Sequence, residues 1–172
     1  MSYRLNSIFN KLIFVSVLAF TIFGCKSDIA AGPAAPDFSL KDLSDKTVTL
    51  KQYRGSIVVL DFWATWCPPC RAAIPELVAM QEKYRDKKLA VIGISMDDPR
   101  KVTNEYLRSF SEKFNINYII LRFDLKVVED YFGAQAPALP TLYIIDRDGQ
   151  VRDKLVGFDP DALQSAVERL LK

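Results

Sequence analysis

Apolar residues follow two kinds of spacing along the chain after residue 36. Residues 56–62 (SIVVLDF) and 89–95 (LAVIGIS) are almost continuously apolar and rich in β-branched side chains, which predicts central strands buried on both faces. The stretches 36–40 and 46–50 alternate apolar and polar residues and predict a short entrance hairpin. Further strands are expected at 117–122 and 141–145, and the turn DRDG leads from the latter into a hairpin strand at 150–156.

Helical spacing begins after the first central strand. Cys70, Ile74, Leu77 and Val78 lie at i, i+4, i+7 and i+8, which is one apolar face of a helix that should begin near residue 67 or 68. A second helix is expected over about 99–114, with its aromatic residues on one side.

Two aspartates are placed to cap the later helices. Asp124 precedes a short helix whose expected apolar residues are Leu125, Val128 and Phe132. Asp159 precedes the final helix, which has proline at its first position. Because strands and helices alternate and a hairpin plus helix closes the chain, the pattern predicts an α/β fold: a central mixed β-sheet flanked by helices, with an N-terminal β-hairpin.

The first 36 residues differ from the rest of the chain. Arg4 and Lys11 precede the apolar run 12–23, and Gly24 and Cys25 follow it. A positive segment, a short apolar segment and a small residue describe a secretory signal, and the run is shorter than the roughly 20 residues of a membrane span. An uncleaved anchor and a buried helix are the alternatives.

Residues 22–25 (IFGC) resemble a lipobox, in which the cysteine is lipidated and becomes the new N-terminus. We therefore expect a lipoprotein-type signal peptide over 1–24, a lipidated Cys25 followed by a flexible tether to residue 36, and one folded domain over 37–172. These segments predict an extracytoplasmic protein, on the periplasmic or cell-surface side of a bacterium, held to the membrane by a lipid anchor.

Charge and composition exclude several classes of function. The chain has 23 basic and 21 acidic residues, and removing Arg4 and Lys11 with the signal leaves 21 of each. A neutral domain without a basic run predicts no nucleic-acid partner. There is no histidine, so histidine-based catalysis and histidine metal ligands are excluded.

The remaining cysteines, Cys67 and Cys70, form a CPPC pair between a predicted strand and a predicted helix. Free N–H groups at a helix start favour a thiolate, which is the nucleophile of disulfide exchange. We expect an exposed Cys67 to attack and a shielded Cys70 to resolve the mixed disulfide. A zinc site would need about four ligands, a haem site would need histidine in place of Arg71, and a structural disulfide would close only a very small loop.

Residues 58–71 (VVLDFWATWCPPCR) resemble the active-site segment of thioredoxin-like proteins, and most closely the membrane-associated TlpA/ResA group. The entrance segment APDFSL, the YFG and LPT segments and the hairpin YIIDRDG also resemble that group, so the resemblance runs from about residue 35 to the C-terminus. It implies a thioredoxin-like fold and a thiol-disulfide oxidoreductase that needs no metal or organic cofactor.

The resemblance implies roles for further residues. Pro140 matches the cis-proline that faces the cysteine pair, which would free the backbone of Leu139 to pair with an extended substrate. Sequence alone would favour an ordinary proline at a strand start. Asp61 matches the buried acid that exchanges the proton of the second cysteine. Trp66 and Pro68, which flank the first cysteine, are expected to contact the substrate as well.

Ala73 departs from the pattern of the group, because many members have glutamate there. This weakens the transfer of a particular substrate such as apocytochrome c. Many TlpA/ResA relatives also have asparagine where this chain has Asp61, so the site looks closer to a thioredoxin-type reducing centre.

We therefore expect a monomeric reductant of cysteine pairs in extracytoplasmic proteins, supplied with electrons by a thiol protein of the membrane. A peroxiredoxin-type peroxidase is one alternative, although Ala64 stands where that group needs threonine. A redox-inert thioredoxin-fold binding module is the other.

Overall fold

The computed structural model describes residues 32–172. The predicted signal peptide, Cys25 and the first part of the expected tether lie outside the described residues. The last part of that tether is paired with the domain: the Ala35 N–H donates to the Gly149 carbonyl at 2.9 Å, and the Val151 N–H donates to the Pro33 carbonyl at 2.9 Å. Ala35 is buried in the core, so the ordered domain includes residues before position 37.

A five-stranded mixed sheet forms the centre of the described domain, in the order β5-β4-β3-β6-β7. β3 runs parallel to β4, and β4 runs parallel to β5, whereas β6 is antiparallel to both β3 and β7. The predicted strands are confirmed. Their observed bounds are Ile57–Trp63 for β3, Leu89–Ser95 for β4, Ile119–Arg122 for β5, Thr141–Ile145 for β6 and Val151–Val156 for β7.

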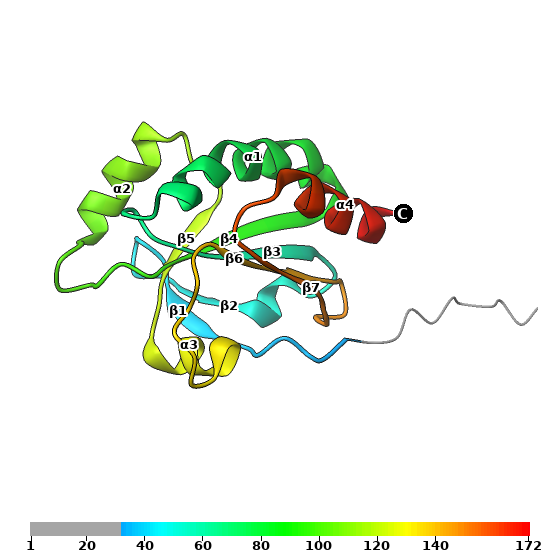
Figure 1. The fold of residues 1–172 in the computed structure, drawn as a ribbon, viewed down its shortest axis with the longest axis horizontal. Coiled ribbons are helices and arrows are strands. Elements are labelled where there is room, and N and C mark those ends of the chain that lie inside the picture. The colour runs from blue at the N-terminus through cyan, green and yellow to red at the C-terminus, as the bar shows by residue number, and fades with distance from the viewer. Residues whose placement is uncertain (1–31) are drawn as a thin grey trace, which may run out of the picture.

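Helices and the entrance hairpin cover the two faces of this sheet (Figure 1). α1 and α4 lie over one face with α2 beside them, and the hairpin and α3 lie over the other. The bounds are Pro68–Tyr84 for α1, Asn104–Lys113 for α2, Leu125–Phe132 for α3 and Pro160–Leu171 for α4; the hairpin strands are Ser39–Lys41 for β1 and Thr47–Thr49 for β2, and short 3-10 turns span Leu50–Tyr53 and Arg85–Lys87. The predicted mixed-sheet α/β fold with an N-terminal hairpin is confirmed.

Every residue of β3 is buried, because the strand lies in the middle of the sheet and both of its faces are covered. Val58, Leu60 and Phe62 pack toward the hairpin and α3, whereas Ile57 and Val59 pack toward α1 and α4. Burial of such side chains contributes about 1.5–3 kcal/mol each. The central strand therefore anchors both layers and holds the chain that follows it in a fixed place.

Two helix predictions need correction. α2 begins at Asn104 rather than near 99, because residues 98–102 form a turn in which the Val102 N–H donates to the Asp98 carbonyl, and Thr103 caps the helix. In α3 the expected apolar residue Leu125 is 80% exposed. The buried residues are Val127 and Tyr131, because the tyrosine hydroxyl bonds to the entrance segment and its ring packs on β3.

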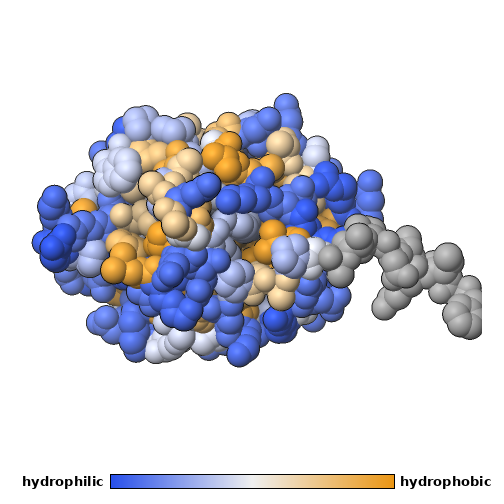
Figure 2. All heavy atoms as spheres, turned by 60° about the horizontal axis from the view of Figure 1, so that its bottom comes forward, coloured by the Kyte–Doolittle hydropathy of each residue, from blue (hydrophilic) through white to orange (hydrophobic). Residues whose placement is uncertain are grey.

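The surface on the hairpin side is mostly hydrophilic, with hydrophobic groups in separate patches (Figure 2). Within residues 32–172 no helix is both long enough and apolar enough to cross a bilayer.

Candidate active site

The cysteine pair lies between the end of β3 and the first turn of α1. Cys67 is the N-cap of α1, and Pro68 occupies the first helical position, where its missing N–H costs nothing. The Cys70 N–H donates to the Cys67 sulfur at 3.3 Å. The start of the helix therefore directs a donor at Cys67, an arrangement that favours a thiolate there when the pair is reduced.

Cys67 and Cys70 form a disulfide with an S–S distance of 2.07 Å and a Cα–Cα distance of 5.3 Å. The expectation that Cys67 is exposed is wrong for this oxidised form: Cys67 is 3% exposed and Cys70 is 1% exposed. Both belong to an apolar cluster with Trp63, Ile74 and Leu107. The two cysteines differ in their place on the helix, since Cys67 caps it and Cys70 lies inside its first turn.

The surface beside Cys67 carries two of the predicted substrate-contact residues. Trp66 is 65% exposed, and Pro68 is exposed on the other side of the cysteine. The structure thus brings both residues next to the disulfide at the surface of the domain.

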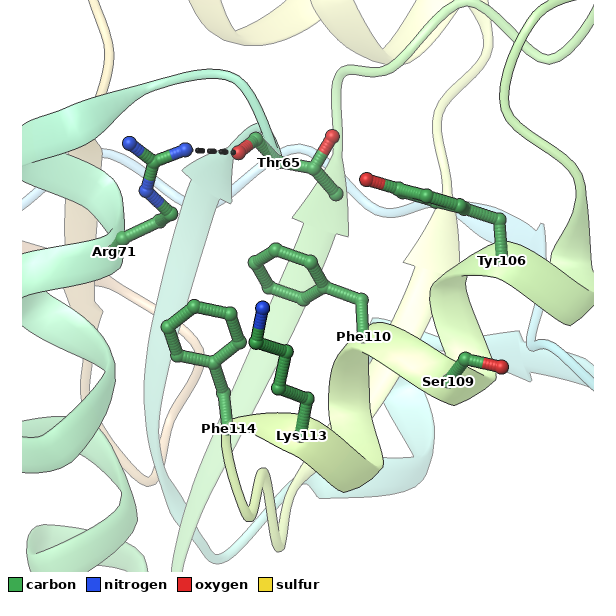
Figure 3. Close-up of a pocket in the computed structure, with 7 residues that line it drawn as sticks. All are labelled: Thr65, Arg71, Tyr106, Ser109, Phe110, Lys113 and Phe114. Atoms are coloured by element: carbon green, nitrogen blue, oxygen red, sulfur yellow. Dashed lines mark hydrogen bonds between the residues drawn. The ribbon is translucent and has the colours of Figure 1, made fainter.

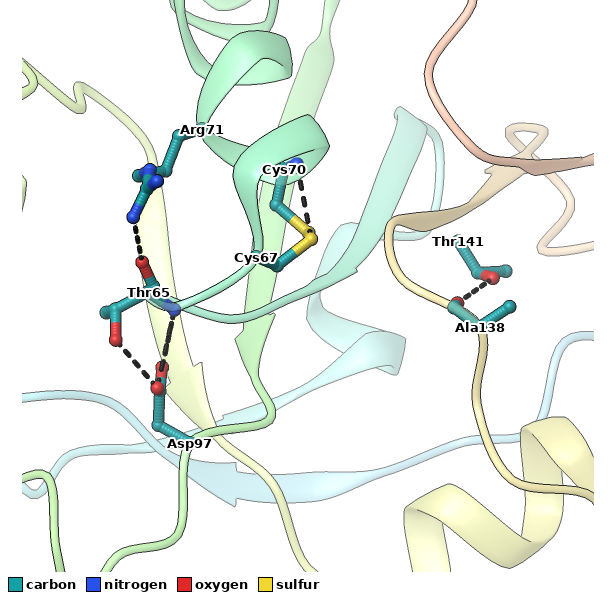
Figure 4. Close-up of a disulfide and its surroundings, with 7 residues drawn as sticks. All are labelled: Thr65, Cys67, Cys70, Arg71, Asp97, Ala138 and Thr141. Carbon is teal, nitrogen blue, oxygen red and sulfur yellow. Dashed lines mark hydrogen bonds between the residues drawn. A yellow bond between two sulfur atoms is a disulfide. The ribbon is translucent and has the colours of Figure 1, made fainter.

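The Leu139–Pro140 bond is cis, as the family resemblance implied. Thr141 begins β6 and pairs with Phe62 near the end of β3, so this segment lies opposite the cysteine pair (Figure 4). Leu139 is half-buried and packs against the cluster that contains both cysteines. The structure therefore assembles the cysteine pair and the Leu139–Pro140 segment from distant parts of the sequence.

Asp61 lies on β3 and is 1% exposed. Gly93 and Leu142 are its neighbours on the two adjacent strands, and its Oδ1 has no hydrogen-bond partner among residues 32–172. Burial raises the pKa of this carboxyl to about 8, because the charged form loses its hydration. Burial also raises the pKa of Tyr118 well above its usual value, and the charge of Asp61 adds to that effect.

Asp97 is a buried site residue that the sequence reasoning missed. Its carboxylate accepts hydrogen bonds from the Thr65 N–H at 3.1 Å, the Thr65 hydroxyl at 2.8 Å and the Ser95 hydroxyl at 2.9 Å. Arg71 donates to the Thr65 carbonyl at 3.1 Å (Figure 4). Thr65 is therefore held from both sides, two residues before Cys67. The sequence could have indicated Asp97, because it closely follows a predicted strand parallel to β3. The carboxyl ends of parallel strands lie at the same edge of a sheet, so polar residues after them come close together.

Ala73, where many TlpA/ResA members have glutamate, is fully buried on the face of α1 that packs on the sheet, in one cluster with Val59 and Leu77. Residues 32–172 contain no group of three or more aspartate, glutamate, cysteine or histidine residues arranged to hold a metal ion.

A mixed five-stranded sheet with a cysteine pair at a helix start and a cis-proline opposite it defines a thioredoxin-like protein. The AhpC/TSA family profile matches residues 31–154, and the chain belongs to this thioredoxin-like family.

Two similar proteins agree with this assignment. Thioredoxin-like protein YneN of Bacillus subtilis (strain 168) is 37% identical over 129 residues, which cover 75% of this chain and 73% of that protein. A thiol-disulfide oxidoreductase ResA of Bacillus cereus is 30% identical over 150 residues, which cover 85% of this chain and 83% of that protein.

A solved structure shows the same architecture. The crystal structure of a putative thiol:disulfide interchange protein DsbE from Chlorobium tepidum has a TM-score of 0.71 and 30% identity, covering 83% of this chain and 99% of that one. The predicted fold class and the predicted enzyme class are confirmed: the chain is a thiol-disulfide oxidoreductase of the ResA or thioredoxin-like type.

Proposed function

We propose that this chain reduces disulfides in extracytoplasmic proteins through Cys67 and Cys70. The observation that carries the proposal is the position of Cys67 at the start of α1, where the Cys70 N–H points at its sulfur. A donor and a helix dipole at one sulfur lower the cost of a thiolate there, and the thiolate is the reactive form.

In the proposed reaction, the Cys67 thiolate attacks one sulfur of the substrate disulfide. The substrate S–S bond breaks, a mixed disulfide forms, and the other substrate sulfur leaves as a thiolate. The Cys70 thiolate then attacks the Cys67 sulfur, which restores the intramolecular disulfide and releases the second substrate thiolate. Two electrons pass to the substrate, and a thiol protein of the membrane returns them by reducing the Cys67–Cys70 bond.

We assign Asp61 to proton exchange with Cys70. A carboxyl with a pKa of about 8 can take up and release a proton near neutral pH, which suits a general acid and base. Asp61→Asn should slow the exchange while the fold persists, and an unchanged rate would remove Asp61 from the mechanism.

The substrate chain is proposed to bind in extended form along Leu139 and Pro140, with Trp66 and Pro68 as further contacts. The packing of Leu139 against the cysteine cluster supports this position, as does the exposure of Trp66. The domain would act as a monomer and without a cofactor.

Trapping the substrate tests the exchange chemistry. Cys70→Ala leaves the attacking thiol but removes the resolving one, so the mixed disulfide should persist and can be identified by mass spectrometry. The double variant Cys67→Ala/Cys70→Ala is the matched control and should trap nothing. If Cys70→Ala captures no protein partner, the exchange proposal fails.

Two further assays separate the alternatives. A peroxidase would consume peroxide when supplied with a reductant, and we expect little consumption. A redox-inert binding module would leave Cys67 of the reduced protein unreactive toward an alkylating reagent at neutral pH, and we expect rapid alkylation.

The proposed site of action is the outer side of a membrane, with Cys25 as the lipid attachment point. The Gly24–Cys25 junction after an apolar run supports this proposal. Cys25→Ala should release a soluble protein, and a variant that stays on the membrane after signal processing would contradict the lipid anchor.

A further inference from the structure

A cavity of about 380 Å³ lies beside the cysteine pair, between the start of α1 and α2. Thr65 and Arg71 line it on the α1 side, and Tyr106, Phe110, Lys113 and Phe114 line it on the other (Figure 3). The cavity touches the reactive centre through Thr65, which is two residues before Cys67. A polypeptide whose cysteine reaches Cys67 therefore has this cavity within a few residues' reach.

Two cations and no carboxylate line the cavity. Arg71 and Lys113 form no ion pair with any residue of the described range 32–172, whereas Arg108 on the same helix as Lys113 is paired with Glu105. Arg71 uses one N–H on the Thr65 carbonyl, and a guanidinium has five such donors. Both cations therefore keep donors for an anionic group.

The cavity also has an aromatic wall. The Phe110 and Phe114 rings stack with their centroids 4.4 Å apart, and Tyr106 is 53% exposed at the rim. Phe110 belongs to the same apolar cluster as Cys67 and Cys70, so this wall is continuous with the packing around the disulfide. Such a surface accepts an apolar side chain as well as a charge.

We propose that this cavity binds a segment of the substrate protein that carries an acidic residue beside an apolar one, close to the disulfide to be reduced. The carboxylate would lie between Arg71 and Lys113, and the apolar side chain would lie on the Phe110–Phe114 wall. This inference rests on the proposed function, because it names the class of substrate for that site. Charge complementarity of this kind selects a partner and speeds its encounter with the site.

The test compares disulfide-containing peptides that differ only at one residue near the cysteine: glutamate, glutamine or lysine. The reduced full chain should favour the glutamate peptide over the glutamine peptide in kcat/KM by roughly five- to tenfold, with the lysine peptide slowest. The preference should shrink as salt rises, since screening weakens partly exposed charge pairs.

Two variants assign the preference to the cavity. Lys113→Glu should abolish or invert the glutamate-to-lysine order of the peptides. Lys87→Glu, in the 3-10 turn that follows α1, is the matched control and should keep that order. If the wild type treats the three peptides alike, or if Lys113→Glu leaves their order unchanged, the cavity assignment is overturned.

A small neutral disulfide, bis(2-hydroxyethyl) disulfide, separates failure of this inference from failure of the proposed function. If the reduced wild type reduces bis(2-hydroxyethyl) disulfide and all three peptides at the same rate, the exchange function stands and the acidic-substrate inference is refuted. If the reduced wild type exchanges with none of these disulfides, the proposed function fails, and the inference fails with it.

Discussion

Replacing Asp61 with asparagine should stabilise the folded protein progressively as the pH rises. The carboxyl is 1% exposed on the central strand, and burial raises its pKa from 3.8 to about 8. Between those two pH values the unfolded chain has released the proton and the folded chain still holds it. Stability therefore falls as pH rises through this window, because ionisation favours the unfolded state.

The size of the effect follows from the pKa difference. One pKa unit corresponds to about 1.4 kcal/mol, so a shift from 3.8 to about 8 costs roughly 6 kcal/mol above pH 8. At pH 7 the cost is about 4 kcal/mol by the same conversion. These are upper limits, since local opening that hydrates the carboxylate reduces the cost. Even half of this effect is a large part of a typical domain stability of about 5–15 kcal/mol.

Urea unfolding of the oxidised protein measures the effect. The fully buried Trp63 gives a fluorescence signal for unfolding, and the disulfide keeps the cysteines from titrating. The free energy of unfolding of Asp61→Asn minus that of the wild type should rise from about pH 4 and level off near pH 8. Other carboxylates are shared by the two proteins, so their contributions cancel in the difference.

Asp86→Asn serves as the control for the loss of one negative charge, because Asp86 is exposed in the turn after α1. The free energy of unfolding of Asp86→Asn minus that of the wild type should not rise steeply between about pH 4 and pH 8. The asparagine amide at position 61 adds an offset that does not depend on pH. A flat difference for Asp61→Asn would refute the reasoning, and a difference that falls with pH would show that Asp61 is ionised and stabilised in the folded state.

Three further substitutions probe the packing around the site, each by denaturant unfolding. Asp97→Asn replaces a carboxylate that accepts hydrogen bonds from Thr65 with an amide that also carries donors, so the free energy of unfolding should fall by about 1–3 kcal/mol and disulfide exchange should slow. If neither changes, Asp97 does not hold Thr65 in place. Gly93→Ala would place a Cβ 2.8 Å from Trp63 Nε1 and should cost about 1–3 kcal/mol, whereas a neutral result would mean that the buried indole can move. Tyr143→Phe loses a 2.6 Å hydrogen bond to the Tyr131 carbonyl and should cost about 1 kcal/mol, whereas a stabilised variant would contradict that role.

Features that depend on neighbouring residues could be predicted from the sequence. The aspartates chosen as caps do accept backbone N–H groups: Asp124 from Val127 at 2.8 Å, and Asp159 from Ala162 at 3.0 Å. The apolar run that predicted a central strand is β3, which lies between β4 and β6. Local patterns were sufficient here because strand burial and helix caps are encoded within a few residues.

Features set by contacts between distant segments could not be predicted in this way. Leu125 looked apolar enough to face the core, but α3 docks through Tyr131, whose hydroxyl bonds to Pro36 at 2.7 Å. The cavity beside the cysteine pair requires the start of α1 to face α2, and nothing within either helix encodes that placement. The burial of Cys67 could not be predicted for the same reason, because the apolar cluster that contains it also includes Leu107 of α2.

The surroundings of Asp61 show how much the sheet register adds to a residue that the sequence already singles out. Asp61 pairs with Gly93 on β4, and Gly93 pairs with Ile120 on β5, two residues after Tyr118. A Cβ on Gly93 would lie 2.8 Å from Trp63 Nε1 and 3.3 Å from the Tyr118 ring, so the glycine makes room for both aromatic side chains. Trp63 lies on the same face of β3 as Asp61 because the two residues are two positions apart on one strand, whereas only the sheet register brings Tyr118 close to the carboxyl.

The register also accounts for the raised pKa of Asp61. The neighbours of Asp61 on the adjacent strands are Gly93 and Leu142, and no ion pair of residues 32–172 includes it. A lysine or arginine at this point would hold the carboxylate charged and lower its pKa. Because burial acts without an opposing charge, the carboxyl keeps its proton up to about pH 8. Burial of Asp61 thus lowers the stability of the folded protein at high pH, and it also raises the pKa of the carboxyl into the range that the proposed proton exchange with Cys70 requires.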